Sequence, residues 1–129
     1  MTKSLYFIYA GGVLHVGWAV FHLFFPRIFK WGKALEPLDP VNRNIMHIIN
    51  LCLCFYFAVA AYLSLSFAPE LADSPLGRKL LAVFAAFWLL RLALQQRFFK
   101  MTHPLSLLLS LAFLVTMLAY GLPLVWAGR

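Results

Sequence analysis

Long apolar stretches alternate with short polar connections along the whole chain. Four of these stretches approach the ~20 residues that an α-helix needs to cross the hydrocarbon core of a bilayer. The pattern therefore predicts an all-α membrane protein, a bundle of four transmembrane helices that run up and down. Because these spans and their connections use nearly every residue, we expect one integral membrane domain. The predicted spans are residues 4–25, 41–68, 76–99 and 104–126, and residues 26–39 form the longest connection.

Three prolines mark where the later helices should begin. Asp39-Pro40, Ser74-Pro75 and His103-Pro104 each place a polar side chain directly before a proline. Proline is favoured at the first position of a helix, where its missing N–H is not needed, and Asp and Ser are good N-caps. We therefore expect these helices to begin at the prolines, ahead of their apolar cores.

The composition supports the membrane assignment. Hydrophobic residues make up 64% of the chain and charged residues only 12%, whereas roughly 25% charged residues is usual in a water-soluble domain. A net charge of +7 is typical of a protein of the bacterial inner membrane that contacts anionic lipid head groups. This explanation is sufficient, so we infer no binding to nucleic acid.

The distribution of lysine and arginine predicts the orientation and the site of membrane contact. In residues 26–39, cations alternate with aromatic and aliphatic side chains, a mixture that favours the head-group layer. More cations lie on the side of the first and third connections than on the other side, which predicts that both termini are outside the cytoplasm. The first side carries Arg27, Lys30, Lys33, Arg43, Arg97 and Lys100, and the second carries Lys3, Arg78, Lys79 and Arg129.

Few polar side chains lie inside the predicted spans, and none of them is a carboxylate. All four acids of the chain fall in connections, which excludes proton relays and di-metal sites built on buried carboxylates. Because an ionisable group facing lipid is costly, the remaining polar residues should face the bundle interior or a partner chain. We expect one polar layer near the basic side, with His15 about 10 Å deeper on the face of His22. The candidate binding residues are His15, His22, His47 and Arg91, supported by Asn44, Asn50, Gln95 and Ser106.

These residues allow two classes of function. In the first, the layer binds heme, a transition metal or a lipid-like, quinone-type ligand. His22 and His47 would be metal ligands, His15 a second ligand, and Arg91 the partner of a propionate, phosphate or carboxylate. In the second, the polar residues specify helix contacts in an accessory subunit of a larger membrane complex or in a homo-oligomer. The chain has no HExxH, CxxC or glycine-rich phosphate loop, so no catalytic residue is assigned.

Two short stretches carry a resemblance to a known family. LFFPRIF at residues 23–29 follows a histidine on the same predicted helix, and KLLAV at residues 79–83 opens the third span. Both resemble the four-helix bacterial protoporphyrinogen oxidase family, whose members are heme-associated membrane proteins. The resemblance implies a heme site in which His15 and Lys79 match the family's first-helix histidine and third-helix lysine. The chain departs from that pattern because His15 lies one turn closer to PRIF and no histidine follows Lys79 on the third span.

Overall fold

A computed structural model describes residues 2–126, and every regular element within them is an α-helix. Three short helices connect four long ones. The long helices are α1 (Lys3–Leu23), α4 (Pro40–Ser66), α6 (Pro75–Phe98) and α7 (Pro104–Trp126). The short helices are α2 (Phe25–Ile28), α3 (Trp31–Ala34) and α5 (Ala68–Asp73). The predicted spans therefore agree with the long helices to within two residues at either end.

The three predicted helix starts are confirmed. Helices α4, α6 and α7 begin at Pro40, Pro75 and Pro104. Asp39 accepts hydrogen bonds from two N–H groups of the first turn of α4, and the Ser74 hydroxyl accepts one at the start of α6. Polar side chains therefore satisfy donors that the helices leave unpaired at their N-termini.

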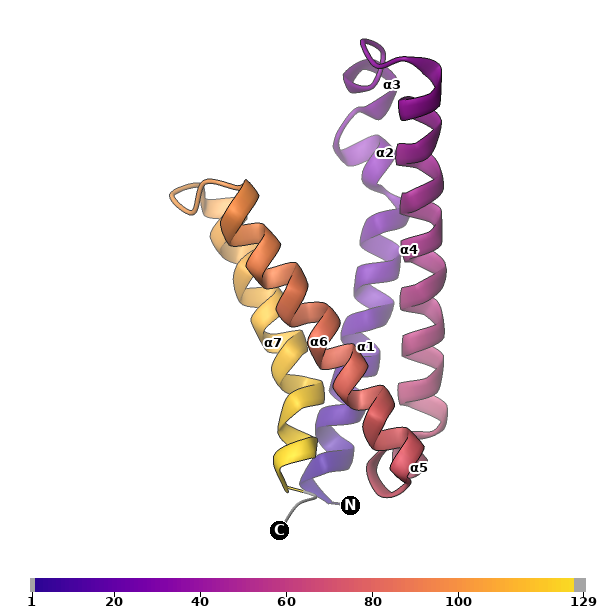
Figure 1. Cartoon of the computed structure of the whole chain (residues 1–129), viewed down its shortest axis with the longest axis vertical. Coiled ribbons are helices and arrows are strands. Elements are labelled where there is room, and N and C mark those ends of the chain that lie inside the picture. The colour runs from indigo at the N-terminus through magenta and orange to yellow at the C-terminus, as the bar shows by residue number, and fades with distance from the viewer. Residues whose placement is uncertain (1, 127–129) are drawn as a thin grey trace.

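The long helices form two antiparallel pairs that meet at one end and separate at the other. Helix α1 packs along α4, and α6 packs along α7. Helix α1 also packs along α7, but only where the pairs converge, close to α5 and to the start of α1 (Figure 1). We call this the closed end. At the opposite, open end, α2 and α3 lie apart from the connection between α6 and α7 (Figure 1).

The expected membrane architecture holds in a coarser form. Three helices, α1, α4 and α7, are long and apolar enough to cross a membrane. Helix α6 is comparable in length, but it is the least apolar of the four because it carries four cations and two glutamines: Arg78, Lys79, Arg91, Arg97, Gln95 and Gln96. The connection at residues 26–39 is not a simple surface strip. It folds into α2 and α3 and buries Trp31 and Leu35, while Arg27, Lys30 and Lys33 stay exposed.

Two clusters of buried side chains hold the pairs together. The first lies at the closed end and joins Ile8, Leu81, Phe84 and Tyr120 to α5. The second is an aromatic layer of Trp18, Phe57, Trp88 and Phe113, one residue from each long helix. The Trp88 ring stacks on Phe57, with ring centroids 5.5 Å apart, and on Phe113 at 5.6 Å. This layer separates the closed end from the open end.

Candidate functional site

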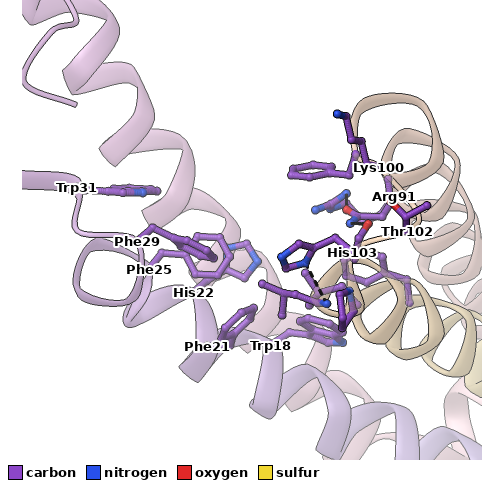
Figure 2. Close-up of a pocket in the computed structure, with 17 residues that line it drawn as sticks. Trp18, Phe21, His22, Phe25, Phe29, Trp31, Arg91, Lys100, Thr102 and His103 are labelled. Carbon is purple, nitrogen blue, oxygen red and sulfur yellow. Dashed lines mark hydrogen bonds between the residues drawn. The ribbon is translucent and has the colours of Figure 1, made fainter. Parts of the chain in front are cut away.

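A cleft of about 730 Å³ opens between the two helix pairs at the open end (Figure 2). One wall is aromatic and comes from α1, α2 and α3, with Phe21, His22, Phe25 and Trp31 among its residues. The other wall comes from α6, α7 and their connection. Trp18 and Phe113 of the aromatic layer form part of the lining. Its cationic side chains all belong to the second wall, and no carboxylate occurs among the described residues that line the cleft.

His22 lies on the aromatic wall and is hydrogen-bonded to Asn50 of α4. The Asn50 amide nitrogen donates to the His22 backbone oxygen at 2.8 Å, so its side-chain oxygen faces the imidazole. That oxygen lies 3.1 Å from His22 Nδ1, and because an amide oxygen only accepts, Nδ1 carries the proton. The ring also stacks on Phe25 at 4.0 Å. Within residues 2–126, Nε2 has no hydrogen-bond partner, and in the neutral ring its lone pair is free.

Arg91 faces His22 from the opposite wall (Figure 2). Its guanidinium donates one hydrogen bond to Gln95 Oε1 at 3.1 Å, and the Gln95 amide donates in turn to Ser106 Oγ at 3.0 Å. The guanidinium carbon lies 4.5 Å from the centre of the Phe113 ring. A guanidinium has five N–H donors, so this half-buried cation uses only one of them within the described chain.

Two further basic residues, Lys100 and His103, lie at the rim of the cleft on the same side as Arg91 (Figure 2). His103 Nδ1 is 3.2 Å from the backbone N–H of Leu105. It accepts that hydrogen bond, so the proton of the neutral ring is on Nε2. In the sequence, His103 stands out only as the residue before a helix start. Its position in a connection between two predicted spans near the basic side was the signal that it could join the site.

His15 lies outside the cleft, in a fully buried hydrogen-bond network at the closed end. The Trp88 indole N–H donates to His15 Nε2 at 3.2 Å. His15 Nδ1 lies 2.8 Å from the Tyr120 hydroxyl and 3.1 Å from the backbone oxygen of Gly11, one turn earlier. The Tyr120 hydroxyl is 2.9 Å from Ser64 Oγ. The four side chains come from four different long helices, so this His15 network joins both helix pairs at one point.

The donors fix the protonation state of His15. An indole N–H only donates, so Nε2 must be unprotonated and the proton of the neutral ring sits on Nδ1. Nδ1–H is then shared between the Gly11 carbonyl and the Tyr120 oxygen, and the Tyr120 hydroxyl is in turn hydrogen-bonded to Ser64. Both ring nitrogens are therefore engaged within the chain, which leaves neither free to bind a metal in this conformation. The expected role of His15 as a second metal ligand finds no support here.

The remaining predicted residues are divided between the two walls and the outer surface. Arg91, Gln95 and Ser106 lie together on one wall, and His22, which is hydrogen-bonded to Asn50 of α4, lines the other. Asn44 and His47 are exposed, and the His47 ring contacts Trp31. Helix α4 begins beyond the end of α1 (Figure 1), and its first turns contact the connection at residues 26–39, for example through Arg43 and the Leu35 carbonyl. Within residues 2–126, no group of three His, Cys, Asp or Glu side chains is placed to hold a metal ion.

A second, apolar groove of about 400 Å³ continues from the cleft between α1 and α7. It shares Trp18, Phe21, Leu105 and Leu109 with the cleft. The rest of its lining is Val13, Leu14, Gly17, Leu108 and Ala112. The cleft therefore has a cationic rim at one side and an uncharged extension at the other.

Comparison of the chain with models of known families, with curated proteins and with solved structures gave no match. The local resemblance of LFFPRIF and KLLAV thus receives no support from whole-chain comparison. The geometry of the cleft is the basis for a functional proposal.

Proposed function

We propose that this chain is a four-span membrane protein whose cleft binds a lipid-like molecule. The observation that carries the proposal is the cleft itself: about 730 Å³, an aromatic wall, and a half-buried arginine with unused donors. Pockets of roughly 300–1,000 Å³ that are mostly apolar and carry a few polar groups are typical of small-molecule sites. An amphiphile satisfies both the apolar wall and the cationic one.

The proposal that α6 also crosses the membrane is supported by its partner. Helix α6 has 24 residues and packs antiparallel along α7, which has 23 and is apolar enough to span. Its polar residues Arg91 and Gln95 turn toward the cleft and α7, so they need not meet acyl chains. Its outward residues Val83, Leu89 and Leu90 are exposed and apolar. A polar stripe that faces the protein interior is compatible with a spanning helix.

The exposed surface also fits a lipid environment. Large apolar side chains are exposed along all four long helices, for example Val13, Phe55, Leu90 and Leu111. Soluble monomers rarely expose continuous apolar patches of more than a few hundred Å². Contact with acyl chains accounts for this surface, and the open cleft is then accessible from within the bilayer.

Ligand-dependent thermal stability tests the proposal. Protein purified in a neutral detergent is heated with and without an added phospholipid or a quinone, because a ligand that binds the folded state raises the Tm. Leu105→Trp places a large ring at the cleft, which Leu105 lines, whereas Leu111→Trp adds the same ring to the outer face of α7. We expect at least one compound to raise the Tm of the wild type and of Leu111→Trp, but not of Leu105→Trp.

Two outcomes would contradict a lipid-binding cleft. If no compound raises the Tm, or if Leu105→Trp responds as strongly as Leu111→Trp, the cleft is not the binding site. A protein that instead co-purifies with a larger membrane complex and is stabilised only by it would favour the accessory-subunit function.

Heme is a second candidate, favoured by the hydrogen bond that His22 makes with Asn50. Metal-bound histidines commonly donate their other ring N–H to an oxygen acceptor, which is the arrangement of His22 Nδ1 and Asn50. Nε2 is then free as a ligand, and Arg91 is available for a propionate. A visible spectrum of the purified protein decides this. A Soret band that is lost in His22→Ala supports heme, and a colourless preparation excludes it.

A further inference from the structure

The charged side chains that line the cleft are all basic. Arg91 and Lys100 line it, and among its described lining residues there is no carboxylate to neutralise them. Arg91 keeps four of its five N–H donors unused within residues 2–126. A guanidinium that is withdrawn from water needs an acceptor, and its planar fork matches the oxygens of a phosphate. The missing partner is therefore an anion.

The cations are spread along the end of α6 and the connection that follows it. Arg91 lies six residues before Arg97, or about 9 Å along α6, and Lys100, Thr102 and His103 follow in the connection at the rim. These groups therefore form a row of hydrogen-bond donors that extends from the α6–α7 connection along α6 to Arg91. If α6 spans a membrane, this row of donors lies where the phosphates of one leaflet meet the acyl chains.

The apolar groove between α1 and α7 gives the ligand a place for a chain. It begins at Trp18, Phe21, Leu105 and Leu109, which it shares with the cleft, and it contains no charged side chain. Gly17 is on its floor, and a Cβ built there meets no atom within 4 Å. A free phosphate would use the cations but neither the aromatic wall nor this groove. A lipid uses all three.

We infer that the cleft selects a lipid with an anionic phosphate head group. The phosphate lies between Arg91 and Lys100, and one acyl chain follows the groove past Gly17. This inference rests on the proposed function and adds the class of ligand. The aromatic side chains of α1 and α2 cover the region between the head group and the chain.

Paired lipids with identical acyl chains test the selectivity. Phosphatidylglycerol and phosphatidylcholine both carry a phosphate, but only phosphatidylglycerol has a net negative charge. Each is added to the protein in a neutral detergent, and binding is measured by native mass spectrometry and by the shift in Tm. For the wild type we expect phosphatidylglycerol to bind on the order of tenfold more tightly, because Arg91 and Lys100 repel the choline cation of phosphatidylcholine and no carboxylate lines the cleft to offset it.

Variants locate the two parts of the ligand. Arg91→Gln should remove the preference for phosphatidylglycerol, whereas Arg97→Gln, on the same helix but outside the cleft, should keep it. Lys100→Gln removes an exposed cation at the rim without touching a helix, and it should reduce the preference even if Arg91→Gln fails to fold. Gly17→Phe fills the groove and should weaken both lipids equally.

The outcomes separate the inference from the proposed function. Equal binding of both lipids to the wild type, abolished by Leu105→Trp, would leave a lipid site and overturn the anion selectivity. Inorganic phosphate that raises the Tm as much as phosphatidylglycerol would overturn the lipid and leave an anion site. Binding of neither lipid would overturn the anion selectivity. If no quinone raises the Tm either, the proposed function is overturned as well.

Discussion

His15 at the closed end uses both ring nitrogens within the chain, whereas His22 at the open end, seven residues later on the same helix, uses one. His15 is fully buried among residues of α4, α6 and α7. His22 is half-buried, and its one hydrogen-bonded neighbour is on α4. The same side chain is therefore structural at one end and free to bind at the other.

The difference arises from how closely the helices approach. At Gly11, a Cβ would lie 2.5 Å from the Tyr120 ring, and at Gly12 it would lie 2.8 Å from Leu65. The two glycines thus let α7 and α4 contact α1 on both sides, which brings Tyr120 of α7 within hydrogen-bond distance of His15 and Ser64 of α4 within hydrogen-bond distance of Tyr120. One turn beyond the aromatic layer, α6 and α7 have separated from α1, and only α4 remains beside His22. Gly11 and Gly12 therefore mark where the helices are closely packed, whereas no atom comes within 4 Å of a Cβ at Gly17.

The largest expected effect is the loss of close packing at Gly11. Gly11→Leu pushes Tyr120 away from α1, which both overpacks the contact and breaks the His15 network. We expect the free energy of unfolding to fall by about 3 kcal/mol or more. Gly17→Leu is the matched control, because nothing lies within 4 Å of the Cβ at that position. Unfolding of both variants in detergent, followed by circular dichroism, should show this difference. Similar losses would mean that the Gly11 contact does not hold the closed end together.

Exchanging the two histidines for leucine compares the ends directly. His15→Leu leaves the buried Trp88 N–H without an acceptor and removes the bond to Tyr120, so we expect a loss of about 2–3 kcal/mol. His22→Leu leaves Asn50 bonded to the backbone, and we expect about 1 kcal/mol. Ligand binding in the cleft should respond in the opposite order, weakened by His22→Leu and retained by whatever fraction of His15→Leu folds. Equal stability losses would show that burial of His15 has no special role.

The helices could be predicted from the sequence, but the separation of the two helix pairs at the open end could not. The helix starts at Pro40, Pro75 and Pro104 follow from local chemistry, since a capping side chain and a proline act within one turn. The divergence of the pairs depends on contacts between residues far apart in the chain, such as Gly11 with Tyr120. Helical periodicity predicts which face of a helix a residue lies on, but it does not predict which residue of another helix that residue contacts.

The candidate site was predicted in part for the same reason. His22, Arg91, Gln95 and Ser106 were identified because polar side chains inside apolar spans are costly unless they are partnered. His15 could not be told from His22, since both lie on one face of α1. Trp88 and Tyr120 carried the missing signal: each has a polar tip that must find a partner when buried. In the structure, Trp88 is hydrogen-bonded to His15, and Tyr120 is hydrogen-bonded to His15 and Ser64.

A smaller effect is expected from matched tyrosine exchanges at the closed end. Tyr120→Phe removes the hydrogen bonds to His15 and Ser64, which we expect to cost about 1–2 kcal/mol of stability. The Tyr56 hydroxyl is buried nearby without a hydrogen-bond partner within the described residues. Tyr56→Phe should therefore be neutral or raise stability by up to about 1 kcal/mol. Thermal unfolding of both variants checks the order, and a larger loss for Tyr56→Phe would show that its hydroxyl has a partner in the membrane.

The smallest expected effect is at Asp39, at the outer edge of the open end. Hydrogen bonds to its carboxylate, chiefly from the backbone N–H of Asn42 and also from the Asn42 side chain and Val41, hold the pKa of Asp39 below its usual value. A lowered folded-state pKa means that the stabilisation is fully present above the unfolded-state pKa of about 3.9. It is lost as the pH falls through that value toward the folded-state pKa.

Asp39→Ser keeps a capping oxygen but removes the titrating group, so it isolates this term. The Tm of the wild type should exceed that of Asp39→Ser by more at pH 5 than at pH 3, because the two proteins differ only at residue 39. Ser74 caps α6 through the N–H of Gly77 at 2.9 Å and does not titrate. Ser74→Ala should therefore lower the Tm equally at the two pH values. A difference in Tm between wild type and Asp39→Ser that stays constant on acidification would mean that these hydrogen bonds do not favour the ionised carboxylate. Asp39 would then cap α4 as an uncharged hydrogen-bond acceptor does.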